Sequence, residues 1–245
     1  MVHQTEWRGP DAPPPPERSE AKVETHALVS QALGSERRIH VSLPDQPSEA
    51  ILFVTDGQAP ADLVRPLEKR GLIPPTAVIG VSNAQEGSIE RNTEYCYGYG
   101  DPRRHAAHRK FFAGEVPEWL AETHGVRAAR ERTIVFGASS GGTFAAEIPI
   151  LEPDKFGGVI ALSAGMSPEL EPHWGEYPAP SYGLGAGTLE VFQKTTQSLE
   201  ARLRRAGVPT LFHEWVGGHD NERWGEALQI LLPPLLEQTQ SPQHT

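Results

Sequence analysis

The chain has 245 residues, a formal net charge of −10 at neutral pH and a single cysteine, Cys96. This length suits one large α/β domain or two small ones, and the negative charge argues against non-specific binding to nucleic acid or to an anionic membrane. One cysteine excludes an internal disulfide and a cysteine-rich metal site. No apolar run reaches the roughly 20 residues of a membrane span, and the first residues show no signal-peptide pattern. We therefore expect a cytoplasmic protein that contacts neither membrane nor nucleic acid.

The two ends differ in composition from the rest of the chain. The first residues contain the run Pro13–Pro16 and few apolar side chains, and the last seven residues are polar. Such composition predicts a disordered, proline-rich arm over residues 1–21, a catalytic domain over 22–238 and a polar tail over 239–245. The arm is either a tail without function or a docking segment for a partner.

The first half of the domain alternates apolar strands with helices. Strands are expected over 23–33 and 37–43, joined by a hairpin at Gly34-Ser35, and the apolar run 50–54 predicts a buried strand. A helix is expected over 61–70, although Pro66 disfavours a regular one, and a second buried strand over 76–81. Residues 83–101 predict a long irregular loop that borders a site, and 103–124 a helix broken or kinked at Pro117.

The second half continues the same alternation. Strands are expected over 133–136, 158–162, 181–185 and 210–216. Helices are expected over 143–148, ending before Pro149, over 188–206, and over 221–236 with an interruption at Pro233-Pro234. This order predicts a mostly parallel sheet with helices on both faces, the architecture of the α/β class. In such sheets the chemistry lies at the carboxyl ends of the strands.

Gly137-Ala138-Ser139-Ser140-Gly141 matches the pattern G-x-S-x-G between a predicted strand and a predicted helix. This is the context of a nucleophile elbow, in which a serine lies at the apex of a strained turn. Glycines on either side remove the Cβ atoms that would clash where strand and helix backbones approach each other. The alternative interpretation is a glycine-rich turn without catalytic function.

A serine hydroxyl needs a base to remove its proton, and the base needs an acid to orient it. The chain order of α/β-hydrolases, Ser then Asp or Glu then His, is met by Ser139, Glu190 and His219. Structural roles remain as alternatives for two of them, a buried histidine for His219 and a helix N-terminal acid for Glu190. Asp220 and Glu176 are the other candidates for the acid. Two backbone N–H groups should bind the oxyanion, one from Ser140 and one from Gln58, which follows the strand 50–54.

Several of these segments resemble the putative esterase family, which includes enterochelin esterases and mycolyltransferases. Phe53-Val54-Thr55-Asp56-Gly57-Gln58 resembles its oxyanion segment, Arg91-Asn92-Thr93-Glu94-Tyr95 its R-x-x-E-Y stretch, and Val135–Gly142 its nucleophile motif. Gly217-Gly218-His219-Asp220, followed by Trp224, is similar to its histidine motif, and Gly187–Glu190 to its G-x-x-E position. The resemblance covers approximately residues 23–236.

The resemblance implies an α/β-hydrolase fold and hydrolysis of carboxylic esters through an acyl-enzyme, without a metal or other cofactor. It supports Gln58 and Ser140 as oxyanion donors and Glu190 as the acid. We expect Arg91, Glu94 and Trp174 to contact a small-molecule ester, whose acyl and alcohol groups stay open, as does the oligomeric state. The alternatives are an acyltransferase and a non-catalytic hydrolase-fold protein that binds a ligand or partner. An anionic siderophore substrate would need a basic pocket, for which the candidates are Arg91, Arg103, Arg104, Arg109 and Lys110.

Overall fold

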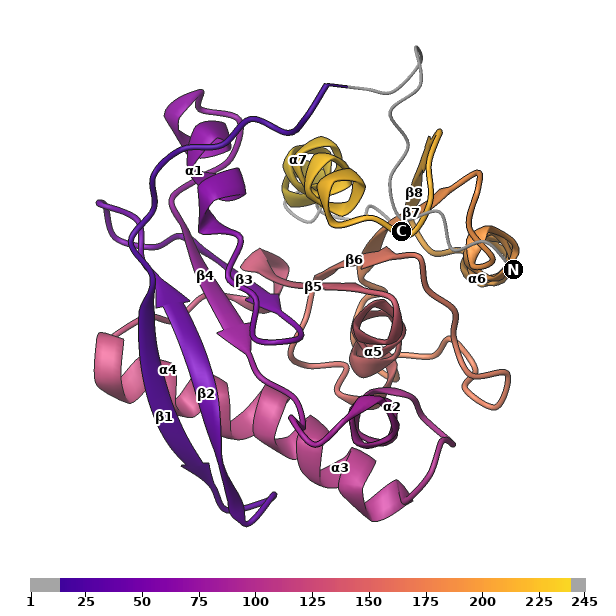
Figure 1. Ribbon diagram of the computed structural model, residues 1–245, viewed down its shortest axis with the longest axis horizontal. Coiled ribbons are helices and arrows are strands. Elements are labelled where there is room, and N and C mark those ends of the chain that lie inside the picture. Colours follow the sequence, from indigo (N-terminus) through magenta and orange to yellow (C-terminus); the bar gives the residue numbers. More distant parts are fainter. Residues whose placement is uncertain (1–13, 239–245) are drawn as a thin grey trace.

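A computed structural model describes residues 14–238, and its centre is one eight-stranded sheet (Figure 1). The strand order is β1-β2-β4-β3-β5-β6-β7-β8. The strands are β1 (Glu24–Ser30), β2 (Ser35–Ser42), β3 (Ala50–Val54), β4 (Thr76–Val81), β5 (Thr133–Ala138), β6 (Gly158–Leu162), β7 (Ser181–Gly187) and β8 (Thr210–Trp215). Strand β2 pairs antiparallel with β1 and β4, and the remaining pairs are parallel. The predicted mostly parallel α/β sheet and its opening hairpin are confirmed.

Helices cover both faces of this sheet. One face packs against α1 (Ala61–Lys69) and α7 (Asn221–Gln238), with a core of aliphatic side chains from the central strands. The other face packs against α4 (Val116–His124), α5 (Ser140–Leu151) and α6 (Gln193–Arg205), and its core holds the buried aromatic rings of Phe53, Phe112, Phe144 and Phe156. Strands β3, β4 and β6 are buried along their whole length, because helices lie on both sides of them.

Two predictions for the middle of the chain need correction. Residues 83–101 are not wholly irregular, since they contain helix α2 (Ser88–Tyr95), which packs against α5. Helix α3 (Pro102–Lys110) continues through a π-helical turn, Phe111–Glu115, directly into α4. Pro117 does not break that helix: it lies just after the π-helical turn, a local irregularity of the kind found where a residue without an N–H lies inside a helix.

The predicted effects of three other prolines were also wrong. Helix α5 passes through Pro149 and ends at Leu151, and α7 passes through Pro233 and Pro234 without interruption. A proline inside a helix costs on the order of 3 kcal/mol, which the burial of the apolar side chains around it offsets. Helix α6 begins later than predicted, so Glu190 lies in the turn before it.

The described part of the N-terminal arm lies against the domain. Ser19 donates its backbone N–H to the Asp62 carbonyl of α1 at 2.9 Å, and the Glu17 N–H donates to the side chain of Gln229 in α7 at 3.0 Å. Arg18 pairs with Asp62 and, at 3.0 Å, with Glu222. Residues 17–19 of the predicted arm therefore contact α1 and α7. Residues 1–13 of the arm and the tail 239–245 lie outside the described residues. Over residues 14–238, no helix has both the length and the apolarity needed to cross a bilayer.

Candidate active site

Ser139 lies in the tight turn between β5 and α5, with φ 58° and ψ −130°. This conformation is costly for a residue other than glycine, and such strain is typical of functional sites. Its N–H donates to the Leu162 carbonyl at 2.9 Å, which fixes the turn to β6. Strand and helix nearly touch here, because a Cβ on Gly137 would lie 2.1 Å from the carbonyl oxygen of Gly141. The two glycines of the motif therefore permit the strained turn.

His219 and Glu190 form a hydrogen-bonded pair at the same edge of the sheet. The His219 Nδ1 lies 2.7 Å from the Glu190 Oε2, and the glutamate side chain is only 2% exposed. The other carboxylate oxygen accepts hydrogen bonds from Ser163 Oγ and from the Gly187 N–H, both at 2.7 Å. A carboxylate held by these donors favours the tautomer with the proton on Nδ1. Nε2 is then left free to accept a proton.

Two aromatic rings and the Ser163 hydroxyl contact the His219–Glu190 pair and hold it in position. The Trp224 ring meets the His219 ring edge-on, with centroids 4.6 Å apart, and Phe192 packs against His219 with centroids 5.0 Å apart. Trp224 Nε1 donates to Ser163 Oγ at 2.9 Å, and Ser163 in turn donates to Glu190. Ser163 and Phe192 were missed in the sequence. The position of Ser163 directly after a buried strand, where Ser139 and His219 also follow strands, was the available signal.

The turn after β3 presents a backbone amide beside the elbow. The Asp56 N–H donates to the Tyr95 hydroxyl at 2.7 Å and the Gly57 N–H to the Val81 carbonyl at 2.9 Å. The Gln58 N–H makes only a long contact, 3.3 Å, with the Thr55 carbonyl. Ser140 is the first residue of α5, so its N–H has no acceptor within the helix. Gln58 and Ser140 are thus the amides of these two turns best placed to serve a ligand.

A cavity of about 650 Å³ opens at the elbow. Its lining includes Ser139 and a set of apolar side chains, among them Val54, Leu63, Phe136 and Trp224. Four charged residues also line it, Arg18, Asp56, Asp62 and Arg91. They pair among themselves: Arg91 binds Asp56 through two contacts of 2.5 and 2.8 Å, and Arg18 binds Asp62. The cavity therefore offers no net positive charge.

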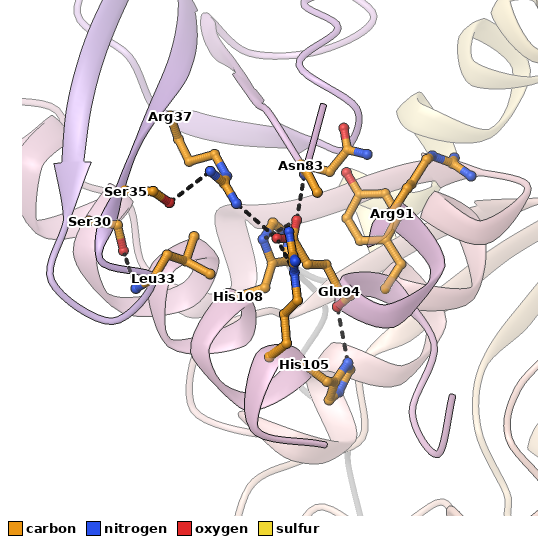
Figure 2. Close-up of polar contacts among 12 residues, drawn as sticks. Ser30, Leu33, Ser35, Arg37, Asn83, Arg91, Glu94, His105 and His108 are labelled. Atoms are coloured by element: carbon orange, nitrogen blue, oxygen red, sulfur yellow. Dashed lines mark hydrogen bonds and ion pairs between the residues drawn. The ribbon is translucent and has the colours of Figure 1, made fainter. Parts of the chain in front are cut away.

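Two residues predicted to bind substrate lie outside this cavity. Glu94 is fully buried between Arg37 at 2.9 Å and Arg104 at 3.2 Å, and it accepts a hydrogen bond from the Ala84 N–H (Figure 2). Trp174 is 7% exposed and belongs to the core. The structure therefore does not bring these two side chains into the cavity lining, because a buried carboxylate is held by charged partners and a buried indole by core packing. Arg91 does line the cavity, although Asp56 occupies its guanidinium.

The other basic residues do not gather into a pocket. Arg103 pairs with Asp101 at 3.5 Å, Arg104 with Glu94, and Arg109 with Glu152 at 2.8 Å, and none of them lines the cavity. Lys110, at the end of α3, does not line it either.

The other two candidates for the acid and the single thiol lie in different environments. Asp220 accepts a hydrogen bond from the Glu222 N–H at 2.9 Å at the start of α7, and Glu176 is exposed in a loop. Burial raises the pKa of the Cys96 thiol to about 11, which keeps it in the unreactive protonated form. Within residues 14–238, no three histidine, cysteine or acidic side chains gather where they could hold a metal ion.

Comparison with known proteins finds the same family that the motifs resembled. The family model described as "Putative esterase" matches residues 30–195. Among solved structures, the enterobactin esterase of Shigella flexneri superposes with a TM-score of 0.72 at 20% identity, over 91% of this chain and 61% of that one. A ferulic acid esterase superposes with a TM-score of 0.70 at 19% identity, over 89% of this chain and 99% of that one. The S-formylglutathione hydrolase of Staphylococcus aureus gives 0.63 at 15% identity, over 89% and 100%.

These structural similarities establish the α/β-hydrolase fold. The chain spans about three fifths of the length of the enterobactin esterase that it matches. No curated protein matches the sequence significantly.

Proposed function

We propose that this chain, which belongs to the putative esterase family, is a serine hydrolase that cleaves carboxylic esters of small molecules. The observation that carries the proposal is the 2.7 Å hydrogen bond between Glu190 and His219, at the sheet edge where Ser139 occupies a strained elbow. An imidazole oriented by a carboxylate, at the strand ends where such a serine also lies, supports activation of the hydroxyl for acyl transfer.

The reaction begins when His219 Nε2 takes the proton of Ser139 Oγ as that oxygen attacks the ester carbonyl carbon. The carbonyl oxygen becomes an oxyanion, which the N–H groups of Ser140 and Gln58 bind. As the tetrahedral intermediate collapses, His219 gives its proton to the leaving alcohol, and the acyl group remains on Ser139. Glu190 stays ionised throughout and stabilises the imidazolium. A water molecule, deprotonated by His219, then releases the carboxylic acid and restores the serine.

The cavity favours an uncharged ester. Each arginine that lines it already faces a carboxylate, so a strongly anionic substrate such as a ferric catecholate would find no unpaired cation among these lining residues. The apolar part of the lining, which includes Leu63 and Trp224, suits an aliphatic or aromatic acyl or alcohol group. The lone free thiol, Cys96, also fits the reducing cytoplasm, which is the compartment that we propose.

The test combines covalent labelling with turnover. The purified chain should react with a fluorophosphonate probe and hydrolyse p-nitrophenyl esters, and Ser139→Ala should lose both activities. Ser198→Ala is the matched control, since Ser198 is an exposed serine on α6. Ester cleavage that survives in Ser139→Ala would refute the proposal, and absence of labelling in the wild type would support a non-catalytic binding protein. Product transferred to an added alcohol in preference to water would identify an acyltransferase.

A further inference from the structure

Helix α2 contacts both turns that carry the oxyanion donors. We propose that Arg91, Asn92 and Tyr95 of this helix are positioning residues that set the geometry of the oxyanion hole. The inference rests on the proposed function, because it assigns a role within the same reaction. It also gives Arg91 a function other than the substrate contact expected from the sequence, in a segment that was expected to be an irregular loop.

The first turn, between β3 and α1, is fixed through Asp56. Asp56 has a positive φ of 62°, which a residue other than glycine adopts only when its surroundings hold it there. Arg91 binds its carboxylate through Nε at 2.5 Å and Nη2 at 2.8 Å, and the Tyr95 hydroxyl accepts its backbone N–H at 2.7 Å. Side chain and backbone of one residue are thus both held by α2. Gln58 follows two residues later, so these contacts determine where its N–H lies.

The second turn, the nucleophile elbow, is fixed through Ser140. Ser140 Oγ donates a hydrogen bond of 2.6 Å to Asn92 Oδ1. The backbone N–H of the same Ser140 is the other proposed oxyanion donor. Asn92 lies beside Arg91 in the sequence, so adjacent residues of one helix hold the two halves of the oxyanion hole.

The two halves also touch each other. A Cβ on Gly141, in the first turn of α5, would lie 2.7 Å from the Asp56 Oδ2. The Asp56 carboxylate that Arg91 holds is therefore pressed against the helix that begins with Ser140. A shift of Asp56 would change the separation of the two donor amides, and a displacement of about 1 Å can cost on the order of 100-fold in rate.

Helix α2 is itself anchored on another side. Glu94 binds Arg37 of β2 and Arg104 of α3, and its second oxygen accepts the Ala84 N–H at 2.6 Å. Figure 2 shows that the side chains of Arg91 and Glu94 leave the helix in different directions. The Glu94 contacts therefore secure the helix to the sheet and to α3, while Arg91 remains available for Asp56. This difference in direction explains why Glu94 is fully buried although it follows Arg91, which lines the cavity, by only three residues.

The experiment compares Arg91→Ala and Asn92→Ala with Arg109→Ala. The control removes an ion pair of similar exposure between Arg109 of α3 and Glu152, which directly follows α5: both are 27% exposed, against 25% and 22% for Arg91 and Asp56. Steady-state kinetics are measured with a neutral ester and with an ester of equal size that carries a carboxylate. We expect kcat to fall about 10- to 100-fold in Arg91→Ala and about 3- to 30-fold in Asn92→Ala. KM should stay within about twofold for both esters, because the lost interaction acts in the transition state.

Two further readouts separate positioning from simple structural support. Affinity for a trifluoromethyl ketone, whose adduct carries an oxyanion, should fall by the same factor as kcat/KM. In the double variant Asn92→Ala with Ser140→Ala, kcat should fall no further than in the worse of the two single variants, since both remove the same hydrogen bond. Arg109→Ala should leave kcat and inhibitor affinity unchanged.

Three results would overturn the inference. A raised KM for the carboxylate ester alone, with kcat intact, would make Arg91 a substrate ligand. Lower thermal stability with unchanged kcat and inhibitor affinity would give α2 a structural role only. Additive losses in the double variant would show that Asn92 does not act through Ser140. Each of these is distinguishable from failure of the proposed function, in which Ser139→Ala itself would retain activity.

Discussion

Replacement of Glu190 by glutamine exchanges one carboxylate oxygen for an NH2 group and removes the negative charge, while leaving the packing almost intact. The carboxylate has two jobs: Oε1 accepts hydrogen bonds from Ser163 and the Gly187 N–H, and Oε2 faces His219 Nδ1 at 2.7 Å. The amide oxygen of glutamine can keep both bonds on the Oε1 side. Its NH2 group must then face His219, and since an amide nitrogen only donates, Nδ1 must become the acceptor. The imidazole proton moves to Nε2, so the ring can no longer take the proton of Ser139.

We expect kcat of Glu190→Gln to fall by on the order of 10²- to 10⁴-fold, which corresponds to about 3–5 kcal/mol of transition-state stabilisation. The variant should still fold, because the side chain keeps its volume and the acceptor for Ser163 and Gly187. The assay measures kcat and KM with p-nitrophenyl acetate alongside urea unfolding at the same pH. A large loss of rate at nearly constant unfolding free energy is the expected pattern.

Asp220→Asn is the matched control for this experiment. Asp220 is adjacent to His219 in sequence, but its Oδ1 accepts the Glu222 N–H at 2.9 Å, a contact that an asparagine oxygen can keep. We expect this variant to remain within about fivefold of the wild-type rate. If Asp220→Asn were inactive and Glu190→Gln were active, the assignment of the acid and the reasoning from the tautomer would both be refuted.

Four more predictions concern the site and one buried carboxyl group. Ser139→Ala should lower kcat by on the order of 10⁴- to 10⁶-fold with unchanged thermal unfolding, and a chelator should leave wild-type activity unchanged. Burial raises the pKa of Glu147 from 4.5 to about 7. As the pH rises, the unfolded chain therefore releases this proton at a lower pH than the folded chain does. The free energy of unfolding should fall by about 3 kcal/mol between these two pH values. Urea unfolding of Glu147→Gln should lack this contribution, and an identical pH dependence in both proteins would contradict it. Arg18→Ala should leave KM within about twofold, because Asp62 and Glu222 already hold its guanidinium, and should change the unfolding free energy by no more than about 1 kcal/mol, since its ion pairs are exposed.

The sheet was predictable because its strands are short apolar runs that end at glycine, proline or polar residues. The ranges 50–54, 76–81 and 158–162 were predicted with the bounds that the structure shows. Helix α2 was missed because Ser88–Tyr95 has no apolar stripe, and its buried residues are Thr93, Glu94 and Tyr95. It is held by the buried ring of Tyr95 and by ion pairs and hydrogen bonds to other elements, and the polar contacts are not registered by periodicity. The helices that run through proline were mispredicted because tertiary burial outweighed the local cost.

For the site too, local patterns could be interpreted from the sequence, whereas contacts between distant residues could not. Ser139 was predicted from a local motif, and Glu190 and His219 from chain order, which fixes where each residue falls among the strands of this fold. The partners of charged residues were not predictable, because they are set by contacts far apart in sequence. Arg91 meets Asp56 across 35 positions and Arg37 meets Glu94 across 57. From the sequence alone, Arg91 was interpreted as a free cation and Glu94 as a polar contact for the substrate.

This pairing changes what the motif R-x-x-E-Y means in this chain. Read as a list of polar residues, it suggests a binding surface, but in the structure two of its members bind Asp56 and the third binds two arginines. Arg91 and Tyr95 hold Asp56 in its strained conformation, whereas Glu94 ties the helix to Arg37 and Arg104. A charged residue whose partner is fixed in the ground state contributes little to substrate affinity, since a ligand must compete with that partner. It contributes to the rate when its partner positions a group that stabilises the transition state. Asp56 is such a partner, because it lies two residues before Gln58, the proposed oxyanion donor.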